Sequence, residues 1–462
     1  MHICFLPLGQ TRLDGLGADR PELAARLHCG TSREQVGFQF VNPIVTIERM
    51  SYGPHALAHL DGKVVFVRGA VPGETVRLKI EETHATYAYA RVEEIVTPSP
   101  LRRLPPCPYL PRCGGCPWQH LRYDAQLEAK QRNFRDHLQR IAKIPDLSLP
   151  APIPSPVEFG YRSRLSLRVE AKDVGFYAAA SHELVPIERC LLGDARVNDA
   201  LPAIQELTRR LCSNVRRIEL AADASEPQVA AAMEIEGPFE QQDEQTALTW
   251  LDAHPMVRGI VLRGKRWTRS YGTPQVSFEP VCGLSLRVRA GVFSQVNPQM
   301  NTVLVTKVRE LLSPHRAERI VDAYAGAGNF ACTLAPDCKE VLAIEVDPAA
   351  GEDLQENVER LGYANVRVMR DTTERALQRL AERDETIHGL VLDPPRSGAR
   401  EAIPWILRLK PQRIVYVSCN SATLARDLAL LGGHYRLEQA TVLDLFPQTY
   451  HFEVVALLVL TC

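Results

Sequence analysis

The stretch RIVDAYAGAGNFACTLA, residues 319–335, decides the fold of the C-terminal part of the chain. Its first half predicts a buried strand that ends at Tyr324, and a Gly-rich turn and a helix follow. Gly326 and Gly328 let the backbone turn tightly and approach a ligand without a Cβ in the way. From residue 300 onward, helix and strand signals alternate, and this alternation predicts a doubly wound α/β domain with a parallel sheet.

Acidic residues stand at the ends of three further strands of this domain. Glu345 ends KEVLAIEVD, 17 residues after Gly328, where a carboxylate suits two hydrogen bonds to ribose hydroxyls. Asp371 ends NVRVMRD, and Asp393 lies in GLVLDPPRSGA. Ligands of open α/β sheets bind at the carboxyl ends of strands, so these positions indicate one crevice. The turn lacks the third glycine of the full dinucleotide pattern, which favours S-adenosylmethionine (SAM) over NAD.

The length and composition of the chain set the frame for this domain. The 462 residues suggest about three domains, and the 54 basic and 55 acidic side chains nearly cancel. We find no run of about 18 apolar residues and no basic flank before a long apolar core at the N-terminus, so we expect neither a membrane span nor a secretory signal. In a cytoplasmic protein, the twelve cysteines are expected to be ligands, a nucleophile or buried apolar residues.

The first hundred residues divide into two parts. Residues 1–41 show no clear periodicity, and we assign this extension no role. Between residues 42 and 100, alternating apolar positions separated by Gly and Asp turns predict a small β-barrel. Basic and aromatic side chains suit RNA binding by this barrel, although a solvated β-module is the alternative. These side chains are Arg77, Lys79, Arg91, Tyr87 and Tyr89.

Residues 101–290 form the predicted central domain, which mixes strands with a helix near 198–213. Its Pro-rich beginning carries Cys107, Cys113 and Cys116, with two glycines that allow tight wrapping. Three thiols within ten residues indicate a metal or cluster site, and Cys190 is the best candidate for a fourth ligand. The spacing does not separate zinc from an iron–sulfur cluster, and three free thiols are the remaining alternative. Part of the charged helix at 121–143 is expected to pack on the C-terminal domain.

A second strand–turn–helix, RIVYVSCNSATLARDL at 413–428, places Cys419 at the turn, where the helix N-terminus favours a thiolate. A thiolate that adds to carbon 6 of uracil makes carbon 5 able to attack the methyl group of SAM. A general base must then remove the proton from carbon 5. Glu453 enters a buried apolar strand, where a carboxylate usually has a functional role or an ion pair. His451 is the rival base, with a surface or packing histidine as the alternative.

Taken together, these motifs resemble the bacterial RNA uracil-5-methyltransferases, and above all the 23S rRNA 5-methyluridine (RumA-like) branch. The likeness covers roughly residues 42–462 and rests on the barrel, CPYLPRCGGC with Cys190, FSQVN, DAYAGAGNF, LDPPRSGA, VSCNSATLARD and HFE. The resemblance implies a Rossmann-like SAM-dependent methyltransferase domain at 291–462. It also implies a TRAM-like barrel at 42–100 that binds RNA and a mixed α+β central domain at 101–290.

The resemblance also implies which residues form the sites. Cys419 would be the nucleophile and Glu453 the base, and a [4Fe-4S] cluster would be held by Cys107, Cys113, Cys116 and Cys190. The SAM site would be lined by Gln295, Tyr324, Gly326, Asn329, Glu345, Asp371 and Asp393. Tyr324 stands where the family often has Phe, and residues 450–452 differ in detail from the approach to the glutamate in relatives.

The expected partner is RNA, with 23S rRNA favoured by the resemblance and tRNA as the alternative; we expect a monomer without a membrane partner. Candidate RNA surfaces are the barrel, the helix at 121–143 and the strip from Arg258 to Arg289, which has seven Lys/Arg and the single acid Glu279. A methyltransferase acting on an amino group is one rival, since Asp393-Pro394-Pro395 is similar to the motif of adenine methylases. An RNA-binding module with an idle SAM site is the other.

Overall fold

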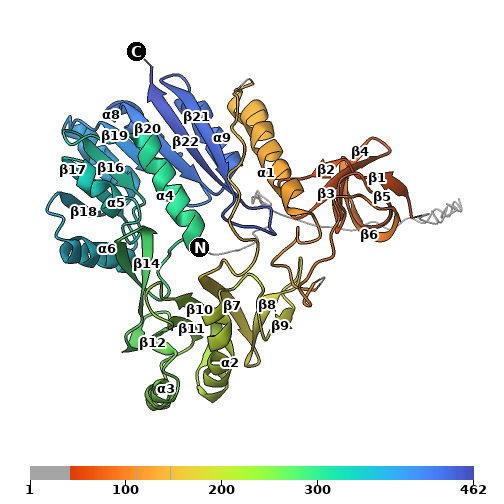
Figure 1. Ribbon diagram of the computed structural model, residues 1–462, viewed down its shortest axis with the longest axis horizontal. Coiled ribbons are helices and arrows are strands. Elements are labelled where there is room, and N and C mark those ends of the chain that lie inside the picture. Colours follow the sequence, from red (N-terminus) through yellow and green to blue (C-terminus); the bar gives the residue numbers. More distant parts are fainter. Residues whose placement is uncertain (1–41, 111, 146, 462) are drawn as a thin grey trace, which may run out of the picture.

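The structure, a computed structural model, describes residues 42–110, 112–145 and 147–461. Figure 1 shows a small β-unit at one end, a mixed central unit and a large C-terminal α/β unit, with helix α1 standing between the first and the last. The predicted fold class is confirmed by this arrangement. The N-terminal extension, 1–41, lies outside the described residues. Within the described ranges, every helix is too short or too polar to cross a membrane.

The N-terminal unit is a strongly curled sheet of six strands in the order β1-β5-β6-β4-β3-β2. Alternate residues of its strands, such as Val65, Val67, Val76 and Leu78, are buried on the inner side, as the period of two requires. Its strands are β1 (Ile44–Thr46), β2 (Arg49–Met50), β3 (Ala56–Leu60), β4 (Lys63–Arg68), β5 (Thr75–Thr83) and β6 (Tyr87–Thr97).

The central unit is a sheet of seven strands in the order β13-β12-β11-β10-β7-β8-β9, with two helices on one face. The opposite face carries Ala221, Ala230 and Val261, which pack towards the hairpin β14–β15 and the C-terminal unit. Its elements are β7 (Arg164–Glu170), β8 (Asp173–Tyr177), β9 (Leu184–Pro186), α2 (Ala195–Arg210), β10 (Asn214–Ala222), β11 (Val229–Glu236), α3 (Gln241–Ala253), β12 (Val257–Arg263) and β13 (Thr268–Gly272), and the hairpin is β14 (Gln275–Val281) and β15 (Leu284–Arg289).

The C-terminal unit is a doubly wound sheet in the order β18-β17-β16-β19-β20-β22-β21, in which the last two strands run antiparallel to their neighbours. Helices cover both faces and form two separate cores. Its strands are β16 (Arg319–Ala323), β17 (Glu340–Glu345), β18 (Val366–Arg370), β19 (Gly389–Leu392), β20 (Arg413–Ser418), β21 (Tyr435–Leu443) and β22 (Glu453–Leu460). Its helices are α4 (Pro298–Leu312), α5 (Ala331–Leu334), η2 (Ala335–Asp337), α6 (Pro348–Leu361), α7 (Thr373–Glu382), α8 (Ile403–Leu409) and α9 (Ser421–Leu431).

Helix α1 (Tyr123–His137) and its continuation η1 (Leu138–Ala142) join the units. Phe134 and Leu138 are part of the C-terminal core, whereas Ala125 and Ala129 are part of the core of the N-terminal unit. A fully buried ion pair of 2.7 Å between Lys130 Nζ and Asp444 Oδ1 fixes α1 to the loop between β21 and β22. Removal of one partner from such a pair leaves an uncompensated buried charge.

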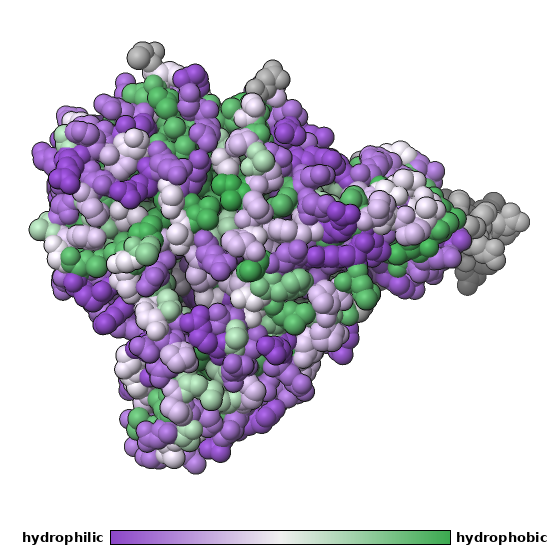
Figure 2. All heavy atoms as spheres, in the orientation of Figure 1, coloured by the Kyte–Doolittle hydropathy of each residue, from purple (hydrophilic) through white to green (hydrophobic). Residues whose placement is uncertain are grey.

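Hydrophilic side chains cover most of the face shown in Figure 2, and hydrophobic ones lie in small groups.

We expect Lys130→Met to destabilise the protein by about 3–5 kcal/mol, because Asp444 would remain buried without its cation. The measurement is the shift of the urea unfolding transition. Lys307→Met is the control, since Lys307 pairs with the exposed Glu310 at 3.3 Å, and its loss should cost at most about 1 kcal/mol. Equal shifts for both variants would contradict a structural role of the buried pair.

Candidate active site

The carboxyl ends of five parallel strands meet at one edge of the C-terminal sheet. The strand order reverses between β16 and β19, because β17 and β18 lie on one side of β16 while β20 continues from β19. Open α/β sheets bind ligands at such a switch point. The structure therefore brings together the predicted residues that end or follow these strands, namely Tyr324, Glu345, Asp371, Asp393 and Cys419.

The turn after β16 has the strained backbone of a ligand-binding loop. Tyr324 has φ +67°, a left-handed conformation that is rare outside glycine, and Gly326 and Gly328 have φ +56° and +101°. A Cβ on Gly328 would lie 2.8 Å from Cys332 Sγ and from Leu354 Cδ1, so this position excludes other residues. Glu345 supports the turn, since its Oε2 accepts a hydrogen bond of 2.8 Å from the Gly326 amide.

Asn329 and Gln295, two predicted residues of the SAM site, are connected by Asn301, which the sequence did not single out. The side chains of Asn329 and Asn301 exchange two amide hydrogen bonds of 2.9 and 3.0 Å. Asn301 also lines a cavity of about 200 Å³ together with Gln295 and Ser294. Asn301 thus connects the Gly-rich turn to the segment that carries Gln295. Sequence reasoning missed Asn301 because a single amide in helix α4 has no distinguishing pattern.

Asp371 lies at the end of β18 and is held by two contacts. Its Oδ1 accepts a hydrogen bond of 2.7 Å from the Thr372 amide, and its Oδ2 pairs with Arg379 at 2.5 Å. These contacts fix the carboxylate beside the N-terminus of α7.

The register of two antiparallel strands places Cys419 opposite Glu453. Ser418, the last residue of β20, pairs with Val454 of β22. Because the strands are antiparallel, Cys419, which follows Ser418, lies opposite Glu453, which precedes Val454. Side chains at directly opposite positions have Cβ atoms about 5 Å apart. Glu453 is 4% exposed, and its Oε2 is buried without a hydrogen-bond partner among the described residues. A buried carboxylate oxygen without a partner is rare and is typical of a functional site.

The backbone around Cys419 is held by its two neighbours. The Asn420 amide donates to Ser418 Oγ at 3.1 Å, and the Ser418 hydroxyl donates to the Asn420 carbonyl at 3.0 Å. Asn420 also caps α9, because its Oδ1 accepts from the amides of Ala422 and Thr423. Its Nδ2 donates to the Arg396 carbonyl at 3.0 Å, which connects the loop after β19 to the loop after β20.

Burial and neighbouring carboxylates determine the protonation of this site. Burial raises the pKa of Asp393 to about 7. Burial, with a contribution from Asp393, raises the pKa of Glu453 well above its usual range. Burial, followed by the charges of Glu453 and Asp393, raises the pKa of Cys419 to about 12, and Arg396 acts in the opposite direction. The prediction of a thiolate favoured by the helix N-terminus is therefore wrong for the ligand-free protein, because desolvation outweighs the helix dipole.

His451, the rival base, has different properties. Burial, together with the positive charges of Arg396, Arg162 and Lys130, lowers its pKa to about 3. Its Nε2 lies 3.3 Å from Arg396 Nη2. A neutral imidazole with so low a pKa is a weak base at neutral pH, so Glu453 is better suited to accept a proton.

Comparisons with known proteins place this geometry in a family. The chain is 35% identical over 428 residues to the 23S rRNA (uracil(1939)-C(5))-methyltransferase RlmD of Pseudomonas putida, covering 89% of this chain and 92% of that protein. RlmD of Thiobacillus denitrificans is 36% identical over 435 residues, covering 90% and 99%. The model of the family described as tRNA (Uracil-5-)-methyltransferase matches residues 282–460, and that of the TRAM domain matches residues 44–92.

The chain belongs to the RNA uracil-5-methyltransferase family. The predicted family, its TRAM domain and the SAM-dependent methyltransferase class are therefore confirmed. The crystal structure of the Pyrococcus abyssi tRNA (uracil-54, C5)-methyltransferase in complex with S-adenosyl-L-homocysteine has the same fold. It has a TM-score of 0.68 and 24% identity, and the match covers 90% of this chain and 100% of that one.

The cysteines that the sequence predicts to be metal ligands lie in one region of the protein. The loop with Cys113 packs on β8, since the Gly114 amide donates to the Tyr177 carbonyl at 3.1 Å, and β9 leads towards Cys190. Burial, with a further contribution from the other thiols, raises the pKa values of Cys113, Cys116 and Cys190. Among the described residues, however, no three His, Cys, Asp or Glu side chains are arranged to hold a metal ion.

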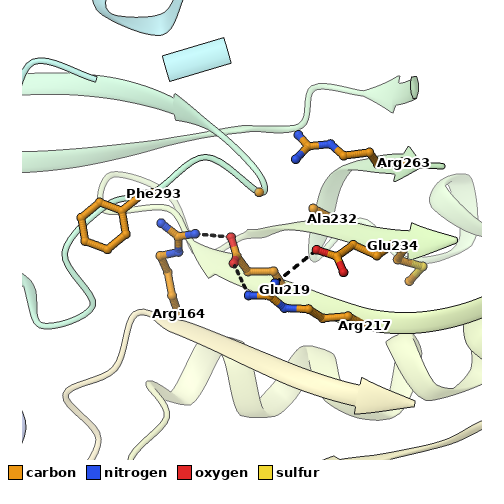
Figure 3. A pocket seen from close by; sticks show the side chains of 9 residues that line it. Arg164, Arg217, Glu219, Ala232, Glu234, Arg263 and Phe293 are labelled. Atoms are coloured by element: carbon orange, nitrogen blue, oxygen red, sulfur yellow. Dashed lines mark hydrogen bonds and ion pairs between the residues drawn. The ribbon is translucent and has the colours of Figure 1, made fainter. Parts of the chain in front are cut away.

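A charged cavity of about 210 Å³ lies on the face of the central sheet opposite α2 and α3 (Figure 3). Arg164 pairs with Glu219 and donates to Ser294 Oγ at 3.0 Å, so the cavity adjoins the segment that carries Gln295. Arg263 points over the cavity and makes no ion pair within the part of the chain that the structure describes. Two other cations of the predicted basic strip are already used inside the protein. Arg258 pairs with Asp223, and Arg289 pairs with Asp353 at 2.5 Å.

We expect Cys419 to react slowly with iodoacetamide in the ligand-free protein, because its raised pKa keeps the thiol protonated. At about pH 8, its rate measured by peptide mass spectrometry should be at least about a hundredfold below that of the exposed Cys282. The Cys419 rate should keep rising about tenfold per pH unit above pH 9, where an ordinary thiol reaches a plateau. A plateau below neutral pH would show that Cys419 is a thiolate.

Proposed function

We propose that the protein transfers a methyl group from SAM to carbon 5 of a uridine in 23S rRNA through a covalent Cys–uracil adduct. The observation that carries this proposal is the placement of Cys419 opposite Glu453 at the edge of the sheet where SAM-dependent methyltransferases bind their cofactor. One side chain supplies a nucleophile and the other a base, and an amino-group methyltransferase would need no such thiol.

The reaction divides into two steps, and each step needs one of these residues. In the first, Cys419 Sγ bonds to carbon 6 of the uracil, and the electron pair that reaches carbon 5 attacks the methyl carbon. SAM would supply that methyl group as an electrophile, and the electron pair of the broken sulfur–methyl bond would stay on sulfur, which leaves as S-adenosyl-L-homocysteine. In the second, Glu453 takes the proton from carbon 5, and the electron pair of the C5–H bond expels the cysteine sulfur from carbon 6. The uracil ring is then restored with its new methyl group.

The raised pKa values suit this sequence. A carboxylate whose pKa lies above its usual range is a stronger base, which favours proton removal by Glu453. Cys419 passes its proton to solvent when it attacks, and the positive charge of Arg396 lowers its pKa. Glu453 Oε2 has no hydrogen-bond partner among the described residues, so it can accept the proton from carbon 5 without breaking an existing hydrogen bond.

The cofactor would bind along the same edge. Glu345 has lone pairs left for ribose hydroxyls although each oxygen already accepts one backbone amide, from Gly326 and from Asp347. Asp371, next along the edge, suits the adenine region. The turn around Gly326 and the Asn301–Asn329 pair would surround the amino-acid part together with Tyr324, Gln295 and Asp393.

The RNA would bind across the three units. The curated relatives at 35% and 36% identity are 23S rRNA methyltransferases, which supports 23S rRNA over tRNA as the substrate. Arg263 beside the charged cavity, which makes no ion pair among the described residues, supplies positive charge for phosphates, and the N-terminal TRAM unit is a further candidate RNA surface. The target uridine must leave its stack to reach Cys419. Ribosomal RNA as substrate places the protein in the cytoplasm, where we expect it to act as a monomer.

We further propose that Cys107, Cys113, Cys116 and Cys190 hold a [4Fe-4S] cluster. Three features support this. All four are free thiols, burial and then the charges of neighbouring thiols raise the pKa values of Cys113, Cys116 and Cys190, and the partly buried Arg162 beside Cys116 and Cys190 has a buried Nε without a partner among the described residues. That cation would offset thiolate charge and donate a hydrogen bond towards sulfur. A cluster of four irons spans more space than a single ion, so its ligands stand further apart.

Incubation of the anaerobically purified protein with SAM and unmodified rRNA or tRNA should yield 5-methyluridine in the 23S rRNA, measured by mass spectrometry of nucleosides. 5-Methyluridine in tRNA alone would overturn the proposed substrate. Methyladenosine or methylcytidine alone would overturn the reaction. If SAM and RNA bind but nothing is methylated, the chain is an RNA-binding module with an idle cofactor site.

Glu453→Gln should allow the first step and block the second, so a protein–RNA adduct should accumulate on a denaturing gel. Product formation should fall by about a hundredfold or more. Cys419→Ala is the matched control and should give neither adduct nor product. Wild-type turnover by both variants would contradict the mechanism.

Anaerobically purified protein should contain about four irons and four sulfides per chain and absorb broadly in the visible. Cys116→Ala should lose the iron, whereas Cys212→Ser should keep it, since Cys212 is an exposed cysteine away from the group. Stoichiometric zinc in the purified protein would show a zinc site in place of the proposed cluster. Protein purified without any metal would show that the cysteines are free thiols.

A further inference from the structure

Tyr52 lies in the loop between β2 and β3 of the TRAM unit, and two buried side chains hold this loop. Asn133 Nδ2 donates to the Ser51 carbonyl at 3.0 Å, and Trp118 Nε1 donates to the Gly53 carbonyl at 3.0 Å. The residues on both sides of Tyr52 are therefore fixed to α1 and to the segment before it. The Tyr52 side chain packs against the core of the C-terminal unit.

The Tyr52 hydroxyl reaches the residue that follows Cys419. It donates a hydrogen bond of 3.3 Å to Asn420 Oδ1, the side-chain oxygen that caps α9. The ring of Tyr52 packs edge-on against His137, with centroids 4.7 Å apart. His137 in turn contacts the same turn, since its Nδ1 lies 2.9 Å from Ser421 Oγ.

The same ring also reaches the residue that precedes Glu453. The rings of Tyr52 and Phe452 meet at 75° with centroids 5.9 Å apart, the edge-to-face geometry that aromatic pairs prefer. The loop before Phe452 is tied to the same support, because the Trp118 amide donates to the Gln448 carbonyl at 3.1 Å. One side chain of the N-terminal unit thus contacts the neighbours of both Cys419 and Glu453.

We propose that Tyr52 is a positioning residue that makes the TRAM unit part of the active site. Its hydroxyl holds the Cys419 turn and its ring holds the Phe452–Glu453 segment, so the distance between thiol and carboxylate depends on the docked barrel. RNA bound on the barrel then stabilises the catalytic arrangement as well as the complex. The proposal rests on the proposed function, because a displacement of about 1 Å at a nucleophile costs rate only where that nucleophile reacts.

The environment of Tyr52 agrees with this role. Burial raises the pKa of its phenol to about 12, although hydrogen bonds with Ser421 act in the opposite direction. The hydroxyl therefore keeps its proton at physiological pH and remains a donor to Asn420. Phenylalanine at this position would keep the ring contacts and remove the hydroxyl with its hydrogen bonds to Asn420 and Ser421.

Tyr52→Phe should lower the single-turnover rate of uridine methylation about tenfold, while the Kd for RNA stays within about twofold of wild type. Tyr435→Phe is the matched control. It removes a hydroxyl that donates to the Pro411 carbonyl at 3.0 Å at the far end of the C-terminal sheet, and should leave the rate unchanged. Tyr52→Ala, which also removes the ring contact with Phe452, should lower the rate further than Tyr52→Phe.

Alkylation of the RNA-free protein gives a second readout that does not depend on the proposed function. Loosening of the Cys419 turn in Tyr52→Phe should expose the thiol and speed its reaction with iodoacetamide at least about threefold. The buried Cys332 reports general unfolding and should react as in wild type. Faster alkylation with slower methylation separates positioning from damage to the nucleophile.

Wild-type methylation and alkylation by Tyr52→Phe would overturn the proposal. A loss of RNA affinity at an unchanged single-turnover rate would overturn it too, because Tyr52 would then be an RNA contact only. If Tyr52→Phe speeds the alkylation of Cys419 but the wild-type protein methylates no uridine, the contact between the units keeps its positioning role. The proposed function is then overturned instead.

Discussion

The antiparallel pairing of β20 with β22 is the constraint on which the site depends. The remaining parallel strands deliver their carboxyl ends to one edge, but a parallel neighbour of β20 would deliver another carboxyl end rather than the start of a strand. Because β22 runs the opposite way, its first residue, Glu453, begins where β20 ends, beside Cys419. The apolar residues that follow Glu453 are buried between two layers of helices, and their packing fixes the register. A slip by one residue would turn Glu453 to the other face of the sheet.

The supports of this pair come from outside the Rossmann-like unit. The loop before Glu453 is held by the buried Lys130–Asp444 pair and by Gln448, whose side chain accepts a hydrogen bond from Gln126 at 3.1 Å. Gln126 and Lys130 both lie on α1. The first half of this helix packs on the barrel and its end packs on the C-terminal core. Carboxylates and a thiol whose pKa values burial raises therefore lie inside a rigid frame built by three units.

The sequence predicted what backbone geometry and strand polarity determine. The glycines of the turn, the acidic residues at strand ends and the thiol at a strand–helix turn follow from local patterns, and the sheet gathers them because its strands are parallel. Asn301 and Tyr52 could not be found in this way, since each acts through a partner more than twenty-five residues away and lies in no motif. The thiolate predicted for Cys419 was wrong because burial and the charges of Glu453 and Asp393 depend on the three-dimensional neighbourhood. The cysteine spacing indicated a metal site, whereas the described side chains alone do not form one.

In the proposed mechanism, Cys419 forms the bond to uracil while Glu453 removes the proton from carbon 5. RNA that carries 5-fluorouridine tests it directly, because fluorine at carbon 5 leaves no proton for the base to take and the adduct cannot resolve. Intact mass spectrometry after incubation with SAM should show protein plus RNA plus one methyl group, and peptide mapping should place the bond on Cys419. A bond to another residue, or methylation without any covalent intermediate, would contradict this mechanism.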